Sequence, residues 1–206
     1  MKKIMFNDQF GLTQAVLDGR KTQTRRVIHF PERANGINAM LLPDGNTISY
    51  FTKKGNPVAI IDGVYCHSFY KPCTPQYFIG EVVAIAQSYN VAKVTCLDYL
   101  RATGNKGVGY VKGFSSKMYV LPDLMPHHIR ITNIRIEQIC NVTDEDAIKE
   151  GVKLYEGVYY GSDSYGFDGF NDRYYPHPQY AYIGLIERMG MRPSDWVFVY
   201  DFELVD

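Results

Sequence analysis

The segment Gly19–Arg26 reads Gly-Arg-Lys-Thr-Gln-Thr-Arg-Arg and brings four cations and two hydroxyls together within eight residues. Because neighbouring positive charges disfavour the charged form of an amine, we expect the pKa of Lys21 to be lowered. A neutral lysine can act as a general base or activate a hydroxyl nucleophile. The alternative is a solvated run of charge with no chemical role.

The same segment is expected to connect a helix to a strand, which determines where its side chains point. On a strand, Thr22, Thr24 and Arg26 would face one side, and Gln23 and Arg25 the other. The hydroxyls would then lie on one face with one of the cations.

A second candidate lies far along the chain, in the acidic segment Thr143–Glu150. Thr143 is a good helix N-cap, and three acids directly after it suit the positive end of the helix dipole. Glu150 is different, because it ends the helix beside Gly151, where a carboxylate is unfavourable to the dipole. Its position indicates a nearby cation; the alternative is an exposed helix end.

The overall composition limits the function classes. The chain has 206 residues, 46% of them hydrophobic, and equal numbers of basic and acidic side chains, 22 of each. The zero net charge argues against coating nucleic acid by bulk charge, although a local basic pocket for one nucleotide remains compatible with it. The four cysteines form no C-x-x-C pair and have no histidine at a zinc-ligand spacing, so we expect reduced, mostly buried thiols and no metal site.

No segment predicts export or membrane insertion. The apolar stretch within Met1–Asp8 is too short for a signal peptide, and no apolar run approaches the ~18 residues needed to cross a bilayer. We therefore expect a cytoplasmic protein without a membrane partner.

The first half of the chain is expected to be mostly β. Apolar spacing predicts a helix over 8–18, capped by Asn7 or Asp8 and ended by Gly19, followed by a strand over 24–30. Turn signals at 43–46, 53–56 and 62–63 separate four further strands, at 39–42, 47–52, 58–61 and 64–69, and another strand is expected at 82–86.

The second half alternates strands, helices and loops. A strand is expected over 129–139 with a bulge near Asn133, then a helix from Thr143 to Gly151, a helix over 179–189 and a strand over 196–204. Residues 100–117 and 155–177 are expected to be loops. No repeated βαβ pattern is present, so we predict a single α+β domain over 1–206, with a curved mixed or antiparallel barrel flanked by a few helices.

Three motifs in this order resemble one known family. These are Gly-Arg-Lys-Thr-x-Thr-x-Arg from Gly19, Gly-Glu-Val-Val from Gly80, and the run from Ile129 through Thr143 to Glu150-Gly151-Val152. Together they are similar to the ASCH (activating-signal-cointegrator homology) domain, and most similar to its longer bacterial and phage members. The resemblance implies a PUA-like β-barrel, in which residues 31–79 are a β-rich insertion and 100–117 and 155–177 are elaborated loops.

The resemblance also implies a site. Small bacterial ASCH proteins include an amidohydrolase that removes acetyl from acetylated cytidine without a metal or other cofactor, and its motif falls here on Lys21, Thr24 and Glu150. Lys21 would deprotonate Thr24, Thr24 would attack the acyl carbon, and Glu150 would hold Lys21. This chain is longer than that enzyme and has Arg25 where it has an apolar residue, which leaves the substrate open.

Two other interpretations remain. The chain could be a non-catalytic module that binds RNA, a nucleotide or a modified base, with Arg20, Thr22, Arg25 and Arg26 as ligand-binding residues and tyrosines stacking on bases. Alternatively, the insertion could contact another protein.

Overall fold

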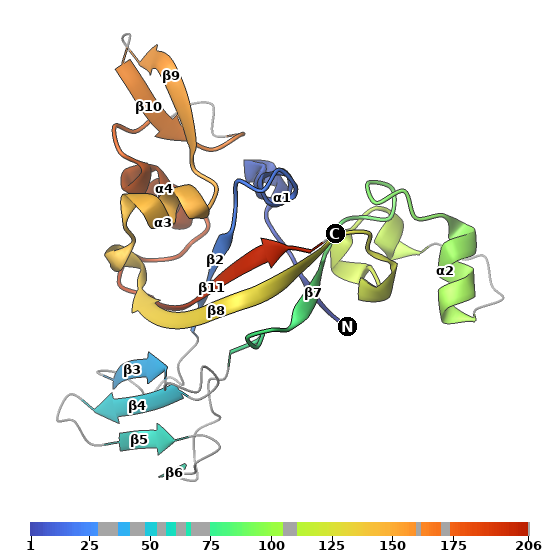
Figure 1. Cartoon of the computed structure of the whole chain (residues 1–206), viewed down its shortest axis with the longest axis horizontal. Coiled ribbons are helices and arrows are strands. Elements are labelled where there is room, and N and C mark those ends of the chain that lie inside the picture. Colours follow the sequence, from blue (N-terminus) through green and yellow to red (C-terminus); the bar gives the residue numbers. More distant parts are fainter. Residues whose placement is uncertain are drawn as a thin grey trace.

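The computed structural model describes residues 1–28, 37–41, 48–52, 57–60, 65–66, 75–104, 111–159, 162–169 and 174–205. Its centre is a five-stranded sheet with the order β1-β7-β8-β11-β2 (Figure 1). The strands are β1 (Lys2–Ile4), β7 (Val82–Ile85), β8 (His128–Gln138), β11 (Trp196–Leu204) and β2 (Gln23–Val27). β1 and β7 are parallel and all other neighbours are antiparallel, so the sheet is mixed.

The α+β class predicted from the sequence is confirmed, but a closed barrel is not seen. A barrel requires its two edge strands to pair with each other. Within the ranges given above, β1 and β2 lie at opposite ends of the strand order and do not pair.

The predicted bulge lies where the sequence indicated. Asp201 of β11 pairs with Asn133, but the next residue, Phe202, pairs with Ile131, so one residue of β8 is left over. This extra residue reverses the alternation of the strand. As a result, Ile131 and Ile134 are both buried, although they are three positions apart and would face opposite sides of a regular strand.

The N-terminal helix is shorter than predicted. The Asn7 side chain accepts a hydrogen bond from the Gln9 amide and caps a 3-10 turn, η1 (Asp8–Phe10). Gly11 then adopts a left-handed conformation (φ 65°), which separates this turn from α1 (Leu12–Leu17). The prediction of one continuous helix was wrong because Gly11 breaks it.

The helix after β8 begins as the sequence predicted. The Thr143 hydroxyl accepts a hydrogen bond from the Asp146 amide and caps α3 (Asp144–Lys149), and Gly151 (φ 99°) follows its end. Helix α4 (Pro178–Arg188) precedes β11 and packs against α3. In Figure 1 both helices lie on the same side of the sheet.

Two predicted loops contain regular structure. Helix α2 (Cys96–Thr103), which has a capping box between Thr95 and Asp98, extends into 100–117. Short 3-10 turns η2 (Lys112–Phe114) and η3 (Lys117–Tyr119) follow. Residues 155–177 include most of an antiparallel hairpin formed by β9 (Lys153–Tyr159) and β10 (Ser162–Gly166). The loop prediction there was wrong because tyrosines, which favour strands, accompany the glycines and aspartates.

The β-rich character of 31–79 is confirmed for its described strands. They form a separate antiparallel sheet of β3 (Ile37–Leu41), β4 (Ile48–Thr52), β5 (Pro57–Ile60) and β6 (Tyr65–Cys66), in sequence order. The predicted turns at 43–46, 53–56 and 62–63 lie outside the described residues.

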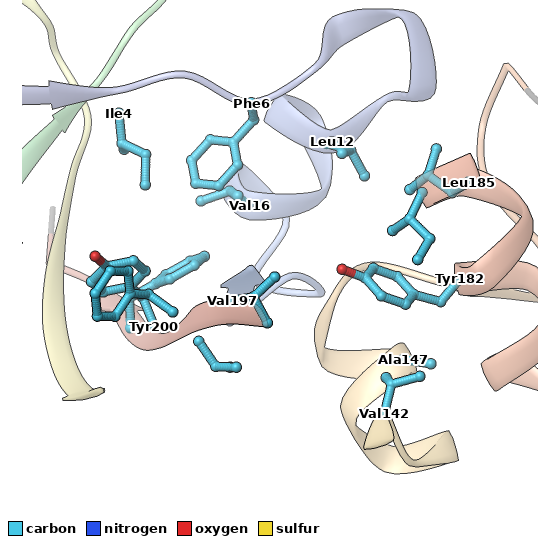
Figure 2. Packing of buried hydrophobic residues seen from close by; sticks show 14 of the residues in the cluster. Ile4, Phe6, Leu12, Val16, Val142, Ala147, Tyr182, Leu185, Val197 and Tyr200 are labelled. Atoms are coloured by element: carbon cyan, nitrogen blue, oxygen red, sulfur yellow. The ribbon is translucent and has the colours of Figure 1, made fainter. Parts of the chain in front are cut away.

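The main core connects the sheet to α1 and α4. Figure 2 shows Phe6 beside Val16 of α1, and Leu12 opposite Leu185 of α4. Tyr182 of α4 is also buried in this cluster.

The expectation of buried thiols was wrong for Cys96 and Cys140, which are free and exposed. Helix α2, where Cys96 lies, buries none of its residues. Cys73 lies outside the described residues.

Candidate functional site

Lys21 and Glu150 form a buried ion pair. The Lys21 ammonium lies 2.5 Å from Glu150 Oε2 and also donates to the Glu150 backbone carbonyl at 2.8 Å. Both residues are almost completely buried, with 2% and 3% exposure. The helix-terminal carboxylate therefore has the cationic partner that its unfavourable position indicated.

Arg25 holds the other oxygen of the same carboxylate. Its Nη1 lies 3.0 Å from Glu150 Oε1, and its Nη2 lies 2.5 Å from Glu137 Oε1 and 3.0 Å from Asp146 Oδ2. Nη1 also donates to Gln23 Oε1 at 2.6 Å. Because the guanidinium is occupied by these internal acceptors, it holds the site together and has little capacity left for a ligand phosphate.

The alternation of side chains along β2 explains why Gln23 and Arg25 contact the same acidic residue. Gln23 and Arg25 project from one face of β2 and both reach Asp146 on α3. Thr24 and Arg26 have the opposite phase in the strand. The alternation expected from the sequence is consistent with these contacts.

The surroundings of Lys21 lower the pKa of its amine. Burial lowers its pKa, the nearby Glu150 carboxylate raises it, and the charges of Arg26 and Arg25 lower it, with a net downward shift. The direction agrees with the sequence prediction, but desolvation is the larger cause. For Arg25, burial alone would lower the pKa, but Glu150, Tyr182 and Glu137 outweigh that effect and leave the pKa raised.

Tyr182 closes the site from the α4 side. The centre of its ring lies 5.4 Å from the Arg25 guanidinium carbon. Burial, followed by the negative charge of Glu150, raises the pKa of Tyr182 well above its ordinary value. Its hydroxyl therefore remains protonated over the working range of most proteins.

A cavity of about 510 Å³ opens beside the ion pair. Lys21, Thr24, Arg25, Arg26 and Glu150 all line it, so five of the seven predicted site residues line the same cavity. Thr24 itself is 5% exposed. A hydroxyl that lines the same cavity as an amine of lowered pKa suits an activated nucleophile.

Arg26 also lines this cavity, and one of its donors has no partner in the described part of the chain. Its Nη2 donates to the Met5 carbonyl at 2.6 Å, and its guanidinium carbon lies 5.9 Å from the centre of the Phe6 ring. Its Nε is buried and has no partner in the described part of the chain. By contrast, the backbone amides of Gly19, Lys21 and Thr22 all donate to carbonyls, so Arg26 is the better candidate to stabilise an oxyanion.

Arg20 and Thr22 do not line this cavity. The Arg20 guanidinium pairs with Asp18 at 3.4 Å and Asp168 at 3.3 Å near the surface. The structure thus separates these two residues from the other five that the sequence singled out.

Several lining residues were not predicted to belong to the site. Tyr182, Leu185 and Met189 come from the apolar face of α4, and Phe6, Asp8 and Lys117 come from distant segments. Their sequence signals were those of ordinary core residues and a helix cap, so only the three-dimensional structure could place them here.

Among the described ranges, no group of three or more His, Cys, Asp or Glu side chains is placed to hold a metal ion. In the same part of the chain, no helix is both long and apolar enough to span a bilayer.

Comparison with protein-family models, curated proteins and solved structures finds no match to this chain.

Proposed function

We propose that the cavity beside Lys21 and Glu150 is an active site for hydrolysis of an amide bond in a small acylated compound, with an acylated nucleoside as the substrate class. The observation that carries the proposal is the buried Lys21–Glu150 pair at 2.5 Å, which lines the same cavity as Thr24. The resemblance to the ASCH family supplies the substrate class, and a PUA-like origin of the sheet is part of the same proposal.

In the first half of the reaction, the neutral Lys21 amine accepts the hydroxyl proton of Thr24 while Oγ1 bonds to the acyl carbon. The carbonyl oxygen becomes negative, and the Arg26 Nε–H, which has no partner in the described part of the chain, would donate to it. The C–N bond then breaks, and the proton passes from Lys21, with Glu150 as its relay, to the leaving amine.

In the second half, water attacks the acyl ester on Thr24 and gives its proton to Lys21. The carboxylic acid leaves as Thr24 takes a proton back, so that one amide and one water give one acid and one amine. Every step uses groups of this chain, in the manner of Ser–Lys hydrolases.

The test is acetate release from N4-acetylcytidine and a panel of other acylated nucleosides by the purified protein. Lys21→Met is expected to lower kcat/KM by roughly 10²–10⁴-fold, the usual contribution of a general base. Thr24→Val should lower kcat/KM at least as much, because it removes the nucleophile. Thr22→Val makes the same chemical change as Thr24→Val but outside the cavity, and it should retain activity. Absence of hydrolysis across the whole panel would refute the proposal.

A second candidate is binding of a nucleoside or modified base without turnover. The unpartnered Arg26 Nε favours it, because a buried donor of this kind suits a ligand carbonyl or phosphate oxygen. Binding of cytidine that persists in Lys21→Met and Thr24→Val, weakens in Arg26→Met and is accompanied by no hydrolysis would support this candidate over the enzyme.

A further inference from the structure

A second cavity, of about 470 Å³, lies next to the first. Asp8 and Lys117 line both cavities and form an ion pair at 2.7 Å, so this pair stands between them. The Lys117 ammonium also donates to the Phe6 carbonyl, and the Asp8 carboxylate accepts from the Thr13 hydroxyl. A ligand extending past this pair would occupy both cavities.

The second cavity has a neutral, hydrogen-bonding wall. Most of its remaining lining residues carry a hydroxyl or a side-chain amide, and Gly11 and Val91 complete the lining. The hydroxyl residues are Thr13, Ser88, Ser115 and Ser116, and the amide residues are Gln14 and Gln87. The lining charges of Asp8 and Lys117 cancel each other. Such a wall complements a group with several hydroxyls, and complements an anionic or purely apolar group less well.

Gln87 provides the independent sign of a missing ligand. It is 8% exposed, and its Oε1 is buried without a hydrogen-bond partner. In the described part of the chain, this oxygen and the Arg26 Nε are the two buried side-chain atoms of this kind, and their residues line the second and first cavity respectively. Each cavity is therefore lined by one residue with an unmet hydrogen bond: Arg26, with a donor, at the first cavity and Gln87, with an acceptor, at the second.

The chain positions Gln87 by close packing. Gln87 follows β7, and its backbone amide donates to Met125 Sδ at 3.4 Å. The Tyr89 amide donates to the Gly113 carbonyl, and a Cβ at Gly113 would clash with the Tyr89 ring. This contact brings the segment that carries Ser115 and Ser116 against the strand end that carries Gln87.

We infer that the second cavity is a binding subsite for a neutral polyhydroxylated group the size of a monosaccharide, with Gln87 Oε1 accepting a hydrogen bond from one of its hydroxyls. That this sugar belongs to the ligand whose acyl amide lies at Lys21 rests on the proposed function. The sugar subsite itself rests on the second cavity alone.

The test is a titration of the ¹⁵N-labelled full-length protein with three probes, D-ribose, cytidine and cytosine, followed by NMR. D-ribose and cytidine are expected to shift the Gln87 side-chain amide signals and the backbone signals of Ser115 and Ser116, while cytosine leaves them unchanged. Gln87→Leu should weaken cytidine binding about five- to tenfold, the effect of losing one buried hydrogen bond.

Gln76→Leu is the matched control, because it makes the same chemical change at an exposed side chain that lines neither cavity. Ser88→Ala, a smaller change in the cavity wall, gives a second reading if Gln87→Leu alters the fold. Unchanged cytidine affinity in both cavity variants, shifts confined to the first cavity, or no binding of any probe would overturn the subsite.

The two proposals can fail separately. If D-ribose binds at Gln87 but no acylated nucleoside is hydrolysed, the subsite stands and the enzyme proposal falls. If N4-acetylcytidine and N4-acetylcytosine are hydrolysed with the same kcat/KM, and Gln87→Leu changes neither, the enzyme proposal stands and the subsite falls.

Discussion

The Lys21 ammonium lies 2.5 Å from the Glu150 carboxylate, although the two residues are 129 positions apart and both are buried. Arg25 occupies the other carboxylate oxygen at 3.0 Å. Glu150 is thus held by two cations, whereas Lys21 depends on Glu150 as its only ion-pair partner in the described part of the chain. This asymmetry has consequences that can be measured.

Removing the Glu150 carboxylate should lower the free energy of unfolding more than removing the Lys21 amine, and more than removing both groups together. Glu150→Leu leaves Lys21 buried without its counter-charge, and we expect a loss of about 3–5 kcal/mol in the free energy of unfolding. Lys21→Met leaves Glu150 paired with Arg25, so its loss should be smaller, and the double variant should recover part of the Glu150→Leu loss. Urea denaturation of all three variants measures this; equal losses for both single variants would contradict the asymmetry.

Arg25 should be the most sensitive arginine of the Gly19–Arg26 segment. Its side chain contacts three carboxylates, and Lys in its place cannot reproduce that planar set of donors. Arg25→Lys is therefore expected to destabilise the protein by about 3 kcal/mol or more, in the range for a broken buried pair.

Arg20→Lys is the control for this change, because its ion pairs lie near the surface. It should alter the free energy of unfolding by about 0–1 kcal/mol. Thermal denaturation of the two variants compares them directly, and similar effects at both positions would show that the Arg25 network contributes little.

The lowered pKa of Lys21 should make its contribution to stability depend on pH. Its folded-state pKa lies below the ordinary value of 10.5, mainly because of burial. Between these two values the unfolded chain binds more protons than the folded one, so stability should rise with pH through this window. Lys21→Met lacks this gain, and the wild type should therefore gain stability relative to the variant as pH approaches 10.5.

Buried tyrosines lower the stability of the protein as pH rises, but their effect is the same in the wild type and in Lys21→Met and therefore does not change the difference between them. Burial raises the pKa of Tyr200 to about 12, so stability from this residue is lost as pH rises from its ordinary value of 10 towards 12. The loss is common to the wild type and Lys21→Met. A constant difference between the two proteins across the alkaline range would exclude the lowered pKa of Lys21.

The sequence was informative wherever a local pattern determines the structure. The Thr143 cap, the bulge near Asn133 and the alternation of β2 all follow from interactions between near neighbours. It was less informative where a pattern had two meanings: Gly11 interrupts the first helix, and tyrosines in 155–177 form a hairpin. These two wrong predictions do not affect the prediction of the site, because β2 and α3, which position its residues, were both predicted.

Only some of the site residues could be predicted from the sequence. Lys21 and Glu150 could be singled out by charge and helix position, together with the family resemblance. Tyr182 and Lys117 could not, because their own segments look like an apolar helix face and a surface turn. The role of Arg25 was also hidden, since a buried guanidinium with three acidic partners cannot be distinguished in sequence from a phosphate-binding arginine.

Gly151, which follows Glu150, should matter for more than its backbone conformation. Its φ is 99°, and an added Cβ would lie 3.4 Å from the Lys21 Cβ and 3.4 Å from the Ala15 Cβ. Gly190 also has a positive φ, 80°, but a Cβ there would meet nothing within 4 Å. Gly151→Ala and Gly190→Ala should therefore share a backbone cost of about 1–2 kcal/mol. Only the added methyl group of Gly151→Ala would contact the Lys21 side chain, at ordinary van der Waals distance. Under the proposed function, only this variant should therefore change kcat/KM beyond the shared backbone effect. Denaturation and N4-acetylcytidine hydrolysis measured on both variants separate the two effects, and identical behaviour would show that Gly151 serves only to end α3.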